Sequence, residues 1–86
     1  MARYKILIKK SATKELREIP KRDLQKIVKR ILSLTDNPRP KGHQKLSHLE
    51  QYRIRQGDYR IIYAIEDEGL AIHIVKIGHR KEIYRS

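Results

Sequence analysis

The segment QYRIRQGDYRIIYAIED, residues 51–67, constrains the fold most, because apolar and polar residues alternate on both sides of a Gly-Asp pair. Alternation with a period of two is typical of a β-strand that is buried on one face only. A two-residue connection with glycine in its first position is typical of a type II′ hairpin turn. The segment therefore predicts strands over 52–56 and 59–65, joined by a tight turn at Gly57 and Asp58.

The two-residue loop also predicts the register of this hairpin, because loop length and turn type together fix strand pairing. The expected cross-strand pairs are Gln56 with Tyr59, Arg55 with Arg60, Ile54 with Ile61, Arg53 with Ile62, and Tyr52 with Tyr63. Residues that lie opposite each other share one face of a sheet. One face should therefore be apolar and available to pack against helices: Tyr52, Ile54, Ile61 and Tyr63. The other face should carry three arginines: Arg53, Arg55 and Arg60.

The expected pairing of Arg55 with Arg60 indicates an anion site. Like charges directly opposed on a sheet are destabilising, so folding alone does not favour this pair. Guanidinium groups are planar and bind phosphate or carboxylate through two parallel hydrogen bonds. The simpler alternative is a solvated face neutralised by nearby carboxylates, for which the hairpin offers only Asp58 at its turn. The residues alone predict binding of phosphate or carboxylate and do not choose between the two.

The overall charge points to a polyanionic partner. The chain has 21 Lys and Arg against 10 Asp and Glu, a formal net charge of +11. Small soluble domains typically carry a net charge of about 2 to 8, so this excess favours nucleic acid first. An acidic protein is the second candidate and anionic lipid the third, while charge that only aids solubility is the alternative. The chain lacks Phe and Trp, which argues against a surface that binds single strands by base stacking.

The rest of the chain predicts further strands and helices by residue range. A strand is expected over 4–9, a short helix over 12–19 with Ser11 as its cap, and a second helix over about 21–35, after Pro20. Residues 36–42 form a loop, 44–49 a short strand or extended segment, 66–69 a turn and 70–77 a last strand. That last strand is apolar on both faces and should therefore lie inside the sheet. The predicted fold class is α+β, a β-α-α-β-β-β arrangement with both N-terminal helices packed on one face of an antiparallel sheet.

Length and composition exclude several other classes. Eighty-six residues predict a single domain over 1–86. No apolar run reaches the roughly 18 to 20 residues of a membrane span, and the absence of cysteine suits a reducing cytoplasm. His73 and His79 are separated by about 20 Å if the strand is continuous, and His43 and His48 have no neighbouring ligand pairs. We therefore expect a cytoplasmic protein that binds no metal and no membrane.

The C-terminal segment completes a resemblance to a known family. YRIRQGDYRIIY at 52–63, the preceding KL at 45–46 and the closing GHRKEIY at 78–84 resemble the RelE/ParE toxin superfamily, specifically its RelE branch. The resemblance implies a ribosome-dependent messenger-RNA endonuclease, the toxin of a toxin–antitoxin pair, acting in the ribosomal A site without metal or cofactor. In such enzymes the ribose 2′-OH attacks the adjacent phosphate, which leaves a 2′,3′-cyclic phosphate and a free 5′-OH.

The same resemblance implies the site residues. Positions matching the RelE catalytic set are Arg53, Arg55, Arg60, Arg80 and Tyr84, and those expected to contact RNA are Arg53, Arg55, Arg60, Arg80 and Lys81. RelE-type enzymes often carry lysines where this chain has Arg53 and Arg55. Arginine, with a pKa above about 12, does not act as a general base. That role falls to Tyr84 or His79, and a histidine at the rim that only contacts phosphate is the alternative reading of His79. Glu82 is a further candidate, for which an ion pair with the neighbouring cations is the favoured reading.

The resemblance also implies partners and leaves two other functions open. An acidic antitoxin should cover the basic surface, and the ribosome and messenger RNA should be the targets. A relative of ParE would use the same fold to inhibit DNA gyrase without cutting RNA. A catalytically inactive module would bind RNA or the ribosome and use its arginines only to hold phosphate.

Overall fold

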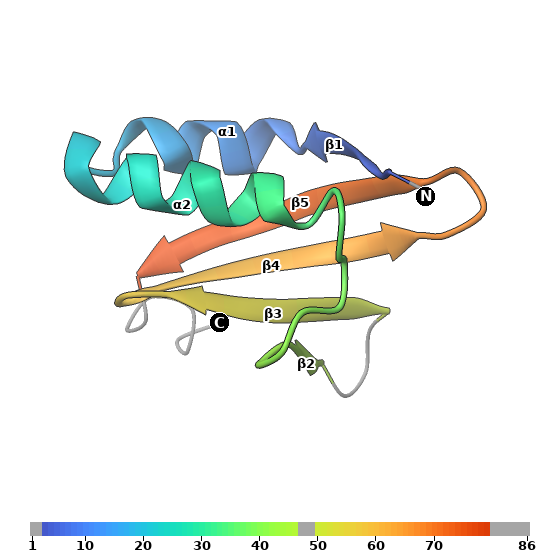
Figure 1. Cartoon of the computed structure of the whole chain (residues 1–86). Helices are drawn as coiled ribbons and strands as arrows, with labels where there is room; N and C mark the ends of the chain where they lie inside the picture. Colours follow the sequence, from blue (N-terminus) through green and yellow to red (C-terminus); the bar gives the residue numbers. More distant parts are fainter. Residues whose placement is uncertain (1–2, 47–49, 80–86) are drawn as a thin grey trace.

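The computed structural model describes residues 3–46 and 50–79 of the chain. Its elements are β1 (Lys5–Ile8), α1 (Lys10–Arg17), α2 (Lys21–Ser33), β2 (Gln44–Lys45), β3 (Gln51–Gln56), β4 (Tyr59–Glu66) and β5 (Ala71–His79). The two helices lie together on one side of a five-stranded sheet (Figure 1). The predicted α+β class is confirmed, and the element order differs from β-α-α-β-β-β only by one more strand, the two-residue β2 within the segment 44–49. Of the residues singled out above, His48, Arg80, Lys81, Glu82 and Tyr84 lie outside the described part.

The strands follow the order β1-β5-β4-β3-β2 across the sheet. β5 lies between β1 and β4, which confirms the interior position expected from its apolar sequence. The pairs β2–β3, β3–β4 and β4–β5 are antiparallel, as predicted, but β1 runs parallel to β5, so the expectation of a wholly antiparallel sheet is wrong at this strand. Parallel strands need a long crossover connection, and both helices and the hairpin lie between β1 and β5 in the sequence.

The β3–β4 hairpin has the predicted register in full. All five expected pairs, from Gln56 with Tyr59 to Tyr52 with Tyr63, lie opposite each other. Gly57 has φ of +60°, and Leu70 is the only non-glycine residue with positive φ in the described part of the chain, so Asp58 has negative φ. Positive φ at only the first central residue is the type II′ pattern. Sequence-local turn chemistry therefore sets which side chains share each face.

Helix α1 begins earlier than predicted. It starts at Lys10 with Lys9 in the N-cap position, and no side chain caps it, so the prediction of a Ser11 cap is wrong. The backbone explains the difference: the Lys9 N–H donates to the Ile74 carbonyl at 2.9 Å, while the Lys9 carbonyl accepts the Thr13 N–H at 2.9 Å. The N–H of Lys9 thus makes the last hydrogen bond to β5, and the carbonyl of the same residue accepts the first hydrogen bond of the helix. Helix α2 starts directly after Pro20, as expected. In the described part of the chain, no helix is both long enough and apolar enough to span a membrane.

The core lies between the helices and the sheet face beneath them. Ile27 and Ile31 of α2 are buried, and the face of the hairpin beneath contributes fully buried Ile54, Ile61 and Tyr63. Burying one such side chain stabilises the fold by about 1.5–3 kcal/mol. A shift of one residue in the hairpin register would expose this apolar set. The core therefore holds the arginines of β3 and β4 on the face away from the helices.

The loop between α2 and β2 is held against the sheet by two polar contacts, from Arg39 and to Pro38, while a third hydrogen bond involves the same Asp67 and a fourth lies within the loop. The Arg39 guanidinium donates to Asp67 at 3.0 Å, and the Tyr4 hydroxyl donates to the same carboxylate at 2.6 Å. The Tyr63 hydroxyl donates to the Pro38 carbonyl at 2.7 Å, and His43 Nδ1 lies 2.7 Å from the Pro40 carbonyl oxygen. Together these contacts place β2 at the edge of the sheet beside β3.

Candidate functional site

Three arginines share the sheet face that the helices leave uncovered. Arg53 and Arg55 come from β3, Arg60 comes from β4, and Arg55 lies directly opposite Arg60. We call these three residues the arginine face. Arg55 is exposed, Arg53 is half-buried, and Arg60 is only 3% exposed. The structure thus brings together the three hairpin arginines that the sequence placed on one face.

Arg60 is buried more deeply than Arg53 and Arg55. On one side it pairs with Arg55, and on the other it pairs with Gly78 of β5. Glycine has no side chain, so it leaves room on this face for the Arg60 side chain. A small hollow of about 40 Å³ at the hairpin end is lined by Arg55, Gly57, Asp58, Tyr59 and Arg60. A buried cation beside an exposed one gives this end of the face a fixed positive charge.

Arg53 has a partner that the sequence did not single out. Gln44 of β2 lies directly opposite Arg53, and Arg53 Nη2 donates a hydrogen bond to Gln44 Oε1. Across residues 3–46 and 50–79, no carboxylate lies within ion-pair distance of Arg53 or Arg55. These two arginines are therefore not neutralised by the described part of the molecule. Within residues 3–46 and 50–79, the predicted alternative of a face neutralised by nearby carboxylates finds no support at these two arginines.

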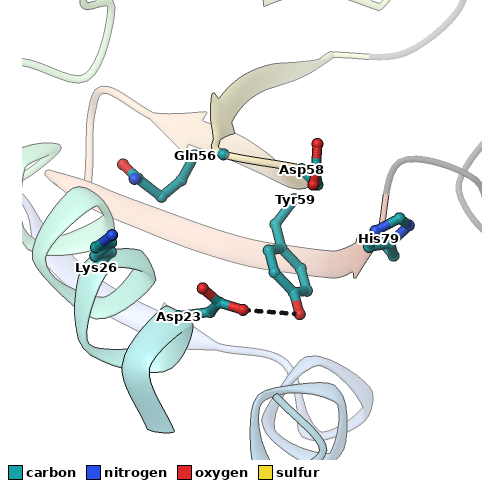
Figure 2. Close-up of a pocket in the computed structure, with 7 residues that line it drawn as sticks. Asp23, Lys26, Gln56, Asp58, Tyr59 and His79 are labelled. Atoms are coloured by element: carbon teal, nitrogen blue, oxygen red, sulfur yellow. Dashed lines mark hydrogen bonds between the residues drawn. The ribbon is translucent and has the colours of Figure 1, made fainter. Parts of the chain in front are cut away.

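His79 lies on the opposite face from the three arginines. It pairs with Tyr59 at the end of β5, and the two rings make an edge-to-face contact with centroids 5.7 Å apart. Tyr59 belongs to the face that carries Ile61 and Tyr63, which packs against the helices. Figure 2 shows both rings beside the end of β5, with Tyr59 directed toward α2. The structure does not bring His79 together with Arg53, Arg55 and Arg60.

A hollow of about 220 Å³ separates α2 from the hairpin turn on this second face. Its lining mixes acidic, basic and aromatic groups: Asp23, Lys26, Gln56, Gly57, Asp58, Tyr59 and His79. The Tyr59 hydroxyl donates to Asp23 at 3.5 Å, as Figure 2 shows. Within the described residues no three His, Cys, Asp or Glu side chains gather as they would around a metal ion. The hollow is thus chemically distinct from the arginine face.

Shifted pKa values occur at the loop that holds β2. Hydrogen bonds from Arg39 and Tyr4 hold the pKa of the Asp67 carboxyl below its usual value. Burial raises the pKa of the Tyr63 phenol to about 12. Both shifts favour the state in which the hydrogen bonds exist, with Asp67 charged and Tyr63 neutral. These groups support the sheet edge that carries Gln44 and Arg53.

Comparisons with known proteins agree on one family of toxins. The family model described as ParE toxin of type II toxin–antitoxin system, parDE, matches residues 6–84. The toxin RelE of Mycobacterium tuberculosis is 31% identical over 84 residues, covering 95% of this chain and 87% of that protein.

Solved structures are similar over nearly the same extent. The RelBE2 toxin–antitoxin complex of Mycobacterium tuberculosis contains a chain with a TM-score of 0.84 and 26% identity, covering 93% of this chain and 94% of that one. The archaeal RelE–RelB complex of Pyrococcus horikoshii gives a TM-score of 0.80 and 30% identity, covering 90% of this chain and 94% of that one.

Proposed function

Because the chain belongs to the RelE/ParE family of toxins from type II toxin–antitoxin systems, we propose that it is an endoribonuclease that cuts messenger RNA on the ribosome. Cleavage proceeds without a metal ion, by attack of the ribose 2′-OH on the adjacent phosphate. The products are a 2′,3′-cyclic phosphate and a 5′-OH end. The catalytic residues are Arg53, Arg55 and Arg60, joined by Arg80 and Tyr84, with Lys81 contacting RNA.

One observation carries this proposal: the arginine face presents Arg53 and Arg55 without described carboxylate partners, beside the buried cation of Arg60. Two arginines directly opposed cost stability, by about 0.2–1 kcal/mol for a cross-strand pair. An anion placed between them offsets that repulsion and accepts charge-assisted hydrogen bonds. A phosphodiester supplies such an anion, and RNA brings one for every nucleotide.

The chemistry requires charge stabilisation more than it requires a metal. In-line attack by the 2′-OH places additional negative charge on the phosphorane oxygens. Guanidinium groups fixed in advance stabilise that charge as it develops, and removal of one such donor typically costs about 10²–10³ in rate. The ribosome and the messenger conformation contribute by holding the 2′-OH in line with the phosphate. The protein's part is therefore a rigid cationic surface.

Proton transfer needs a residue other than arginine, since a guanidinium stays protonated throughout the working range of pH. The two candidates are Tyr84 and His79. His79 contacts Tyr59 on the face opposite the arginines, which favours Tyr84 as the proton acceptor. In this assignment positive charge from nearby arginines stabilises the phenolate form of Tyr84.

The partner that restrains this activity is an acidic antitoxin similar to RelB. The supporting observation is that both solved relatives described above are toxin–antitoxin complexes. The charge of the chain supports the same partner, since a formal net charge of +11 favours an acidic segment that covers it. The ribosome, whose RNA exposes many phosphate groups, competes with the antitoxin for the same basic surface of the toxin.

A second function has one observation in its favour. The matching family model describes ParE toxins, so inhibition of DNA gyrase without RNA cleavage is the alternative. An inactive module that only binds the ribosome is the third possibility. The arginine face distinguishes these functions, because only the nuclease requires its guanidinium groups for chemistry.

The experiment is translation in a cell extract, with primer extension to map cuts in the messenger RNA. We expect the wild-type protein to cut within ribosome-occupied codons and an Arg53→Ala, Arg55→Ala variant to leave those codons intact. The matched control, Arg22→Ala with Lys29→Ala, removes two exposed cations from α2 and should still cut. Intact RNA with inhibited gyrase supports the ParE-like function, and intact RNA with salt-sensitive ribosome binding supports the inactive module.

A further inference from the structure

We propose that Gln44 is a positioning residue that holds the Arg53 guanidinium in place on the arginine face. This inference rests on the proposed RNA cleavage and adds a residue to that same site. Gln44 lies on β2 directly opposite Arg53 on β3, so the two side chains share a face of the sheet. Arg53 Nη2 donates to Gln44 Oε1, which fixes one edge of the guanidinium plane.

Gln44 is itself held in place by the contacts of the short strand β2 with β3. β2 has only two residues, Gln44 and Lys45, and pairs with β3 alone. Beyond it the Leu46 N–H donates to the Gln51 carbonyl at 2.9 Å, which keeps β2 against β3. Before it, the His43 ring lies 5.8 Å from the Tyr52 ring, centroid to centroid. The chain on both sides of Gln44 therefore contacts β3, through a backbone hydrogen bond after it and a ring contact before it.

The loop that leads into β2 is anchored to the rest of the sheet. Arg39 donates to Asp67 at 3.0 Å, and the Arg39 guanidinium carbon lies 5.7 Å from the centre of the Tyr52 ring. Asp67 follows β4 directly, so this loop connects the edge carrying Gln44 to the interior of the sheet. An exposed two-residue edge strand needs such anchors, because pairing over two residues is weak by itself.

The consequence for Arg53 is a smaller loss of side-chain freedom when it binds phosphate. A long arginine side chain on an exposed sheet face samples several rotamers, and immobilising it on binding weakens the interaction by about two- to tenfold. The amide oxygen of Gln44 accepts from one Nη group and leaves the other N–H groups of Arg53 for phosphate oxygens. Because an amide is neutral, it orients Arg53 without cancelling its positive charge. A carboxylate at position 44 would orient the guanidinium and also neutralise it.

The test combines a structural readout with a catalytic one. The structural readout is nitrogen-15 NMR of the Arg53 guanidinium, assigned by the signal missing from Arg53→Lys. In wild-type protein we expect slow rotation of the guanidinium and separate Nη–H signals. In Gln44→Ala we expect faster rotation and averaged signals, while Gln44→Glu keeps the slow rotation. The matched control is Gln25→Ala, which removes an exposed glutamine from α2 and should leave the Arg53 signals unchanged.

The catalytic readout is the cutting rate on programmed ribosomes. We expect Gln44→Ala to cut about two- to tenfold more slowly than wild type, with an unchanged melting temperature. Because Gln44 acts through Arg53, adding Gln44→Ala to an Arg53→Ala variant should slow cutting no further. Gln44→Glu should also cut slowly, although the Arg53 guanidinium stays oriented, because the new carboxylate neutralises the positive charge of Arg53.

Several results would overturn the inference, and they differ from failure of the proposed function. Identical Arg53 signals in wild type and Gln44→Ala would show that Gln44 does not hold the guanidinium. Equal cutting by these two proteins, or independent losses from Gln44→Ala and Arg53→Ala, would show that Gln44 does not act through Arg53. If the wild-type protein cuts no RNA, the proposed function is wrong, and the catalytic part of the inference is overturned with it. The NMR comparison still decides whether Gln44 orients Arg53.

Discussion

Arg55 lies directly opposite Arg60 across the β3–β4 hairpin, the first exposed and the second almost fully buried. This pair places two positive charges where sheet stability alone would favour one charge or none. The arrangement is therefore better suited to binding an anion than to stabilising the free protein. A protein that keeps such a pair should trade a small amount of stability for function.

Removing the repulsion should stabilise the free protein. We expect Arg55→Gln to raise the free energy of unfolding by about 0.2–1 kcal/mol, because the cross-strand repulsion from Arg60 is lost. Urea denaturation at low salt measures the change. The control is Lys29→Gln on α2, which removes one positive charge from an exposed helix position without relieving a cross-strand pair. An Arg55→Gln variant no more stable than the control would show that the arginine pair is not strained.

The carboxyl of Asp67 should make stability depend on acid pH. Its pKa is lowered in the folded protein by hydrogen bonds from Arg39 and then Tyr4. A lowered pKa contributes stability that is present above the ordinary value near 3.8 and is lost as pH falls through the folded value. Wild type should therefore exceed Asp67→Asn in unfolding free energy at pH 7. The unfolding free energies of the two proteins should converge as pH falls below 3.8, measured by urea denaturation.

The result that would contradict this prediction is a difference in unfolding free energy between wild type and Asp67→Asn that stays constant from pH 7 to about pH 2. Such a result would mean that the ionised carboxylate is not what holds the loop against β4.

Ionisation of Tyr63 should lower the free energy of unfolding at alkaline pH. Burial raises the pKa of its phenol from 10.0 to about 12, and its hydroxyl donates to the Pro38 carbonyl at 2.7 Å. The folded protein holds this proton more tightly than the unfolded chain, so stability should fall as pH rises from 10 to about 12. Tyr63→Phe should lose about 0.5–1.5 kcal/mol at pH 7, through loss of the hydrogen bond. It should also show a shallower decline in stability above pH 10.

Ultraviolet titration checks the assignment of Tyr63. Five tyrosines are present, and the last one to ionise in wild type should be missing from Tyr63→Phe. If the late-ionising group persists in the variant, it belongs to a different tyrosine.

Glu15 should stabilise the edge of β5 that β1 leaves unpaired. β1 pairs with β5 only from Ala71 to Ile74, and beyond this the Ile77 N–H donates to Glu15 Oε1 at 3.1 Å. Lys76 Nζ lies 3.2 Å from the other carboxylate oxygen. Glu15→Ala leaves the Ile77 N–H without this acceptor and should destabilise the protein by about 1–3 kcal/mol.

Glu15→Gln is the informative comparison for this edge, because it keeps an acceptor and removes the charge. Its loss measured by urea denaturation should be clearly smaller than that of Glu15→Ala. Equal losses would assign the stabilisation to the ion pair with Lys76 instead of the backbone hydrogen bond.

Sequence reasoning succeeded where local chemistry decides the structure. The Gly57-Asp58 turn and the period-two alternation fixed every pair of the hairpin, and with them the common face of Arg53, Arg55 and Arg60. The direction of β1 could not be predicted in the same way, because the chain from residue 9 to residue 70 lies between β1 and β5 and their pairing depends on tertiary packing. The helix start at Lys10 differed for a similar reason, since Lys9 is fixed by a hydrogen bond to β5.

The site was predictable only in part. Gln44 carries no local signal, because its importance comes from lying opposite Arg53 in a two-residue strand. His79 was a candidate for proton transfer at the arginine site, and the last strand was expected to end at residue 77. The strand instead continues to His79, and its pairing with Tyr59 places that side chain on the helix-covered face. One or two residues of strand length thus decide which face a side chain occupies.

The rate of messenger-RNA cutting on programmed ribosomes, compared between wild type and Arg55→Ala, tests the central claim most directly. The arginine face predicts that the variant cuts about 10²–10³-fold more slowly and that the wild-type products carry 2′,3′-cyclic phosphate and 5′-OH ends. Ribosome binding at low salt should change far less than the rate, because many other cations remain. An unchanged cutting rate in Arg55→Ala, or wild-type products with 5′-phosphate ends, would contradict the account.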